Sequence, residues 1–135
     1  MGVVKREIAE KEVNEWLAYK KVPDAYIKGS QMYISGIIIA IEEGTFTINE
    51  TTKEITHKLK FPIGSGDLQI SELKYKPRLT VAAIQANVSG LGVTDLTGRT
   101  LGIIAALTGL PRTEIAAMDS EDLRPASDVA AFFSQ

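Results

Sequence analysis

The sequence contains no cysteine and only one histidine, His57. Without cysteine the chain forms no disulfide and offers no thiolate to a metal ion. A lone histidine leaves a metal site or a nucleophile–histidine pair without its other members. His57 alternates with Ile55 and Leu59, so we expect it on the half-buried face of a strand. There its role is structural, and replacement by alanine is expected to cost only modest stability.

Long apolar runs are also missing. The run Ile37-Ile38-Ile39-Ala40-Ile41 is far shorter than the roughly 20 apolar residues of a membrane-spanning helix. Residues 1–15 are rich in charge and lack the apolar core of a signal peptide. We therefore expect a cytosolic protein that has no membrane partner.

Neither sign of charge dominates, since 15 basic residues face 17 acidic ones and the net charge is −2. This balance gives no electrostatic reason to expect nucleic acid as a partner. The acid pairs Glu42-Glu43 and Glu121-Asp122 are explained by a turn and by a helix start. We find no candidate catalytic, cofactor-binding or metal-binding residue. A basic run on two strands is read as a solvated sheet face; it comprises Lys58, Lys60, Lys74, Lys76 and Arg78.

The first half of the chain predicts one helix followed by strands. Residues 7–20 repeat apolar positions at helical spacing. Residues 32–41 are rich in β-branched side chains and are predicted as a central strand, with Glu42-Glu43-Gly44 as a hairpin loop. Residues 45–49, 55–61 and 68–75 follow as alternating strands, and a spacing slip between Ile70 and Leu73 predicts a bulge. The result is a four-stranded antiparallel meander over residues 31–76.

After Pro77 the apolar period changes from 2 to 3.6, which predicts a cluster of short helices over residues 79–134. Thr80 is expected to cap a helix that buries Val81, Ile84 and Val88, and residues 93–98 are expected to form a loop. Gly109 ends a helix and Pro111 opens the next. A last helix starts near Ser120, and Pro125 is expected either to delay its start or to bend it. The fold class is therefore α+β.

Phe132 and Phe133 are neighbours on this last helix, so their side chains point about 100° apart. Two interpretations stay open for the pair. Both rings can belong to the core, or one of them can anchor a partner chain.

Three segments between about residues 55 and 135 resemble the phage tail assembly chaperones of Mu-like prophages and related tailed phages. The first is His57-Lys58-Leu59-Lys60-Phe61-Pro62-Ile63, and the second is Ile70-Ser71-Glu72-Leu73-Lys74-Tyr75-Lys76-Pro77. The third runs from Leu107-Thr108-Gly109-Leu110-Pro111 through Met118-Asp119-Ser120-Glu121-Asp122-Leu123 to Ala131-Phe132-Phe133. Arg78-Leu79 intervenes before Thr80, which departs from the family's short polar step into the helix. Residues 1–50 lie outside the resemblance, and we expect them to join residues 51–135 in one compact unit.

The resemblance implies a chaperone that is not an enzyme and needs no cofactor. Such proteins hold the helical tape-measure protein soluble in the host cytoplasm until the tail tube assembles. An amphipathic partner helix would lie in an apolar groove, and a second copy of the chain is another candidate partner. The alternative is a structural tail or neck protein of the virion that assembles through its sheet edges. The candidate groove residues are Leu101, Ile104, Leu107, Leu110, Ile115, Met118, Phe132 and Phe133.

Overall fold

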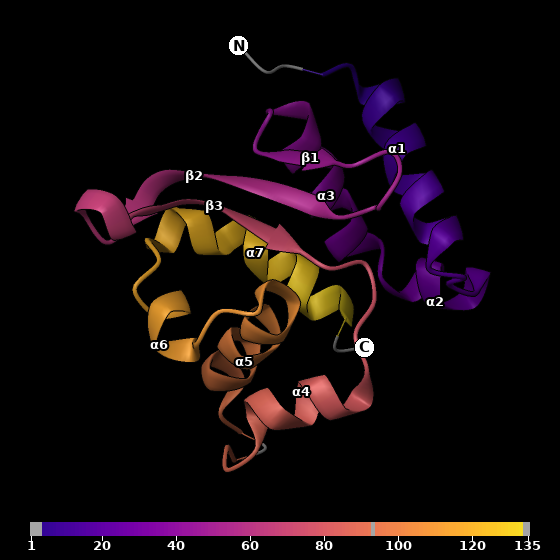
Figure 1. Ribbon diagram of the computed structural model, residues 1–135. Coiled ribbons are helices and arrows are strands. Elements are labelled where there is room, and N and C mark those ends of the chain that lie inside the picture. Colours follow the sequence, from indigo (N-terminus) through magenta and orange to yellow (C-terminus); the bar gives the residue numbers. More distant parts are fainter. Residues whose placement is uncertain (1–3, 93, 134–135) are drawn as a thin grey trace.

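The computed structural model describes residues 4–92 and 94–133 (Figure 1). The elements occur in three groups along the chain. The first is helical, with α1 (Arg6–Tyr19), α2 (Asp24–Gly29) and α3 (Gln31–Glu42). The second is the sheet, with β1 (Phe46–Ile48), β2 (Ile55–Ile63), the short 3₁₀ helix η1 (Gly66–Leu68) and β3 (Ile70–Tyr75). The third comprises α4 (Val81–Val88), α5 (Leu96–Thr108), α6 (Arg112–Ile115) and α7 (Ser120–Phe133). The predicted α+β class and the predicted C-terminal helical cluster are confirmed.

The sheet is an antiparallel meander in the order β1-β2-β3. Ile55, His57 and Leu59 are buried on one face of β2, whereas Lys58 and Lys60 are exposed, as the alternation predicted. The ladder between β2 and β3 shifts register between Lys58 and Ile63, which confirms an irregularity in this pair. Beyond that shift the alternation fails, and Phe61 is 52% exposed instead of buried.

The prediction of a strand over residues 32–41 is wrong, because this segment forms α3. Its buried residues Ile34, Ile37, Ile38 and Ile41 have the spacing of one helical face. The β-branched composition concealed that pattern, and burial of the isoleucines outweighs their weak intrinsic preference for strands. The sheet in the described residues therefore has three strands instead of four, and Glu42-Glu43-Gly44 joins a helix to β1 instead of closing a hairpin.

The C-terminal helices begin and end largely where the sequence predicted. The Thr80 hydroxyl accepts a hydrogen bond from the Ala83 N–H at 3.1 Å, as expected of a cap, but Val81 is 72% exposed instead of buried. Part of the loop expected over residues 93–98 is helical, because α5 begins at Leu96 and Asp95 caps it; residue 93 lies outside the described residues. Gly109 ends α5 with a φ of 79°.

Helix α7 runs from Ser120 to Phe133 with Pro125 inside it, so the proline does not delay the start of the helix. The Asp119 carboxylate accepts a hydrogen bond from the Glu121 N–H at 2.9 Å and so caps the first turn. In Figure 1, α7 passes beneath the sheet, with α4, α5 and α6 on its lower side and α1 and α2 to the right. Helix α7 contacts α3, α5 and β2, and it contributes Ala126, Val129, Ala130 and Phe132 to the buried core.

Candidate functional site

The eight predicted groove residues do not line one common groove. Five of them are buried within the chain: Ile104, Leu107, Ile115, Met118 and Phe132. These five belong to the core under α5, α6 and α7. Leu101, Leu110 and Phe133 are only partly buried and pack against the edge of this core. The surface available to a partner is therefore smaller than the sequence predicted.

Leu101 lines a shallow cavity between α5 and α7 with a volume of about 160 Å³. Leu96, at the first turn of α5, also borders the cavity and is 72% exposed. Leu123 forms the opposite wall on α7. We call this surface the α5–α7 groove and define it by Leu96, Thr97, Thr100, Leu101, Leu123 and Ser127.

Phe132 and Phe133 pack into an aromatic cluster at the end of α7. The ring of buried Trp16, from α1, lies 5.4 Å from the Phe132 ring and 6.2 Å from the Phe133 ring, centroid to centroid. The Tyr26 hydroxyl donates a hydrogen bond to the Phe132 carbonyl at 3.1 Å. Phe132 is thus a core residue, whereas Phe133 keeps a partly exposed face.

Lys20 covers that aromatic cluster. Its Nζ lies 3.8 Å from the centre of the Phe133 ring, a distance at which a cation is attracted to the ring face. The same Nζ donates a hydrogen bond to the Pro77 carbonyl. Burial, with a smaller contribution from the charge of Arg78, lowers the pKa of Lys20 to about 8. Lys20 therefore joins the end of α1 to the segment between β3 and α4.

Asp122 lies in the first turn of α7, as the sequence predicted, but the sequence did not predict that its side chain is buried. Its carboxylate is buried and accepts hydrogen bonds from the backbone N–H groups of Lys60 at 2.8 Å and Phe61 at 2.9 Å. These two groups lie where the β2 and β3 ladder changes register. Asp122 therefore joins α7 to β2, which is a structural task that explains its burial.

His57 is completely buried on the inner face of β2, beside Ile55 and Leu59 in the alternation. Its Nδ1 lies 2.6 Å from the Tyr75 hydroxyl, and its ring packs edge-on against Phe46. Burial lowers the pKa of His57 to about 4, although the charge of Asp122 opposes the shift. The neutral imidazole is thus a core group. Because the ring is fully buried, we now expect the His57→Ala variant to lose more stability than the sequence alone suggested.

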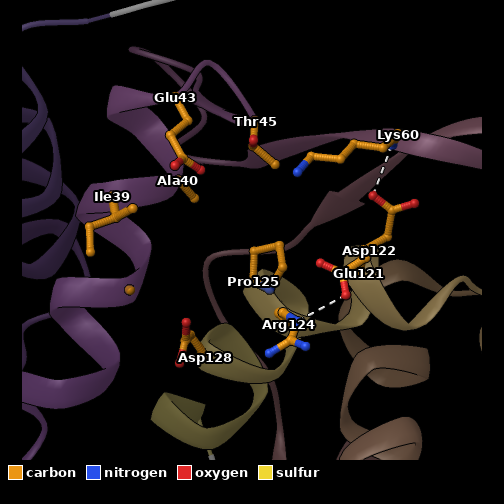
Figure 2. Close-up of a pocket in the computed structure, with 11 residues that line it drawn as sticks. Ile39, Ala40, Glu43, Thr45, Lys60, Glu121, Asp122, Arg124, Pro125 and Asp128 are labelled. Carbon is orange, nitrogen blue, oxygen red and sulfur yellow. Dashed lines mark hydrogen bonds and ion pairs between the residues drawn. The ribbon is translucent and has the colours of Figure 1, made fainter.

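A second cavity, of about 260 Å³, lies between α3, α7 and the start of the sheet. We call it the Asp128 pocket. Figure 2 shows the Glu43 and Asp128 side chains on opposite sides of it, with Pro125 between them. Gly36 makes this approach of the helices possible, because a Cβ atom there would lie 2.0 Å from Asp128 Oδ2. Its lining comprises Gly36, Ile39, Ala40, Glu43, Thr45, Lys60, Glu121, Asp122, Arg124, Pro125 and Asp128.

In the described part of the chain, no three histidine or acidic side chains gather as metal ligands would. Nor does any described helix combine the length and apolarity required to cross a membrane. What the surface offers is a shallow groove on α5 and α7, half of whose lining residues are leucines, and a charged pocket on α3 and α7. The Asp128 pocket depends on Gly36 of α3 lying against Asp128 of α7. Because the sequence predicted a strand in place of α3, this contact could not be foreseen.

Comparison with known proteins matched the chain to a protein family. Residues 56–135 match the family described as "Phage tail assembly chaperone proteins, E, or 41 or 14". The match begins in β2 and contains β3 and α4 to α7, so it includes the whole α5–α7 groove. Searches of curated proteins and of solved structures gave no match.

Proposed function

Since the chain belongs to the phage tail assembly chaperones, by a match over residues 56–135, we propose that it binds the tape-measure protein of its phage. Binding would keep that long helical protein soluble in the cytoplasm of the bacterial host during tail morphogenesis. The family match is the observation that carries this proposal. A role in tail assembly, with a tail protein as partner, follows from the family itself.

The α5–α7 groove is the proposed contact for a tape-measure helix. It lies within the matched residues and exposes Leu96, while Leu101 and Leu123 form its apolar walls. An amphipathic helix can place its apolar side chains in such a groove. The partly exposed Leu110 and Phe133 remain candidate contacts. The five buried residues of the original set support the groove from beneath, because they fix the positions of α5, α6 and α7.

We further propose that the protein acts without catalysis and without a cofactor. The family is named for chaperones, which are not a class of enzyme. The titratable groups whose pKa shifts most in the core, His57 and Tyr75, bond to each other inside the sheet face. Both side chains are buried, so neither is presented to a substrate at the surface.

A structural protein of the virion is the alternative role. It would assemble through the outer strands β1 and β3, which each pair with β2 alone within the described sheet. Strand β1 has only three residues, and exposed charges on Glu72 and Lys74 flank the pairing edge of β3. Short, charged edges oppose edge-to-edge association. Detection of the protein in purified virions would favour this alternative over the chaperone.

The test compares two exposed leucines by co-purification with the tape-measure protein. Leu96→Asp places a charge in the α5–α7 groove at the first turn of α5, where an acidic residue is compatible with the helix. Leu68→Asp is the matched control, because Leu68 is 89% exposed in η1, outside the groove. We expect Leu96→Asp to reduce recovery of the tape-measure protein about tenfold or more, as at an interface hot spot, with no effect of Leu68→Asp. Equal recovery with both variants would place the contact elsewhere.

A further inference from the structure

We propose that the Asp128 pocket receives a lysine or arginine side chain from the helical partner. The inference rests on the proposed function and adds a second, electrostatic contact to the α5–α7 groove. The pocket is bordered by α3, which lies outside the family match, and by α7, which lies inside it. The pocket would therefore give this chain a specificity for its partner that the matched region alone does not supply.

Charge complementarity is the first reason. The lining contains the four carboxylates of Glu43, Glu121, Asp122 and Asp128 against the two cations of Lys60 and Arg124, so acid exceeds base by two. Glu121 is paired with Arg124 at 3.3 Å, and Asp122 is occupied by two backbone N–H groups. Glu43, Asp128 and Lys60 remain, so acid still exceeds base by one, with Glu43 and Asp128 on opposite sides of the pocket (Figure 2). A positively charged side chain that enters the pocket would be attracted to both carboxylates.

The environment of Asp128 is the second reason. Within the described part of the chain its carboxylate forms no ion pair and no hydrogen bond. It is only partly exposed and lies against the backbone of α3 at Gly36. Burial raises the pKa of Asp128, which means that its negative charge is poorly solvated. An incoming cation would restore the lost stabilisation.

The shape of the pocket fits a long basic side chain. Ile39, Ala40 and Pro125 provide apolar walls against which the methylene stem of lysine or arginine can pack. Lys60 is exposed and its side chain reaches along the pocket from the β2 side in Figure 2. It can move into solvent when another cation enters. At about 100° per residue, Pro125 and Asp128 lie on nearly the opposite side of α7 from Leu123 and Ser127, so a partner that contacts both sites must pass around this helix.

The test measures affinity for purified helical segments of the tape-measure protein at low and high salt. Asp128→Asn removes the charge with little change of shape, and Asp67→Asn, at an exposed aspartate in η1, is the matched control. We expect Asp128→Asn to weaken binding about tenfold at low salt and to flatten the salt dependence. Gly36→Ala is a second variant. Its Cβ atom would displace the Asp128 carboxylate without removing its charge, and it should weaken binding in the same direction.

The partner residue is identified by replacing each lysine and arginine of the bound segment with methionine, which keeps a similar stem. One such replacement should weaken binding as Asp128→Asn does, and combining the two should add no further loss. If wild type and Asp67→Asn bind but Asp128→Asn binds equally well, the pocket proposal is wrong and the proposed function stands. If the wild-type chain binds no segment, both fail. If Asp128→Asn instead converts a dimer of the free chain to monomer, the occupant is a second copy and the proposal is overturned.

Discussion

At the scale of single residues, His57 shows how burial sets the charge of a side chain. Its ring is enclosed by the sheet face, and the Tyr75 hydroxyl is the partner of Nδ1 at 2.6 Å. Nε2 is buried and meets no hydrogen-bonding group of the described residues. An imidazolium, which must donate from both nitrogens, is therefore disfavoured, and the pKa of His57 falls to about 4.

This shift predicts a loss of stability in mild acid. Between the ordinary pKa of 6.5 and the folded value of about 4, the unfolded chain binds a proton that the folded chain does not. The free energy of unfolding should therefore fall as pH falls through this window, by about 3 kcal/mol in total. Urea unfolding at pH 7, 5 and 4, followed by the fluorescence of Trp16, measures it.

His57→Gln is the control for that titration, because glutamine keeps a hydrogen-bonding group near Tyr75 but does not ionise in this range. The difference in stability between wild type and this variant should change with pH in favour of the variant. A difference that stays constant from pH 7 to 4 would show that another group causes the acid sensitivity.

At the scale of the elements, Asp122 makes α7 and β2 one unit. Its carboxylate satisfies two backbone donors at the irregular part of the β2 and β3 ladder. Asp119, three residues earlier, only caps α7. Asp122 therefore connects α7 to β2, whereas Asp119 stabilises only the start of α7.

Replacing these aspartates with alanine should give unequal losses. Asp122→Ala leaves two N–H groups without their acceptor and should lower the free energy of unfolding by about 2–4 kcal/mol. Asp119→Ala removes a helix cap and should lower it by about 1 kcal/mol. Chemical denaturation of both variants at pH 7 measures the difference. Equal losses would mean that Asp122 contributes no more than a cap.

The helices and strands also show which structural features the sequence could predict. Period and capping residues predicted β1 to β3, the Thr80 cap and the Gly109 turn, because these depend on local conformation and on simple alternation. The helix α3 was missed because four isoleucines at helical spacing stood within a β-branched run. The Asp128 pocket could not be predicted without α3, since it exists only where Gly36 meets Asp128. Likewise, no local signal showed that Ile104, Leu107 and Phe132 would be core residues instead of an open groove.

At the scale of the whole molecule, the family region and the residues before it share one buried cluster. Val13 and Trp16 of α1, Ile37 and Ile41 of α3, and Phe132 of α7 all belong to it. The family match begins at residue 56, so α1, α2, α3 and β1 pack against a region that the family defines. Deleting them would uncover the aromatic cluster of α7. What remains for a partner is the α5–α7 groove on one side of α7 and the Asp128 pocket on the other.

The most direct test of the central claim is the soluble fraction of the tape-measure protein in cells that co-express it with this chain. We predict that the wild-type chain and Leu68→Asp keep most of the tape-measure protein in the supernatant, whereas Leu96→Asp, with an unchanged circular dichroism spectrum, leaves it in the pellet as in cells without the chain. Tape-measure protein that is equally soluble with and without the wild-type chain would contradict the account.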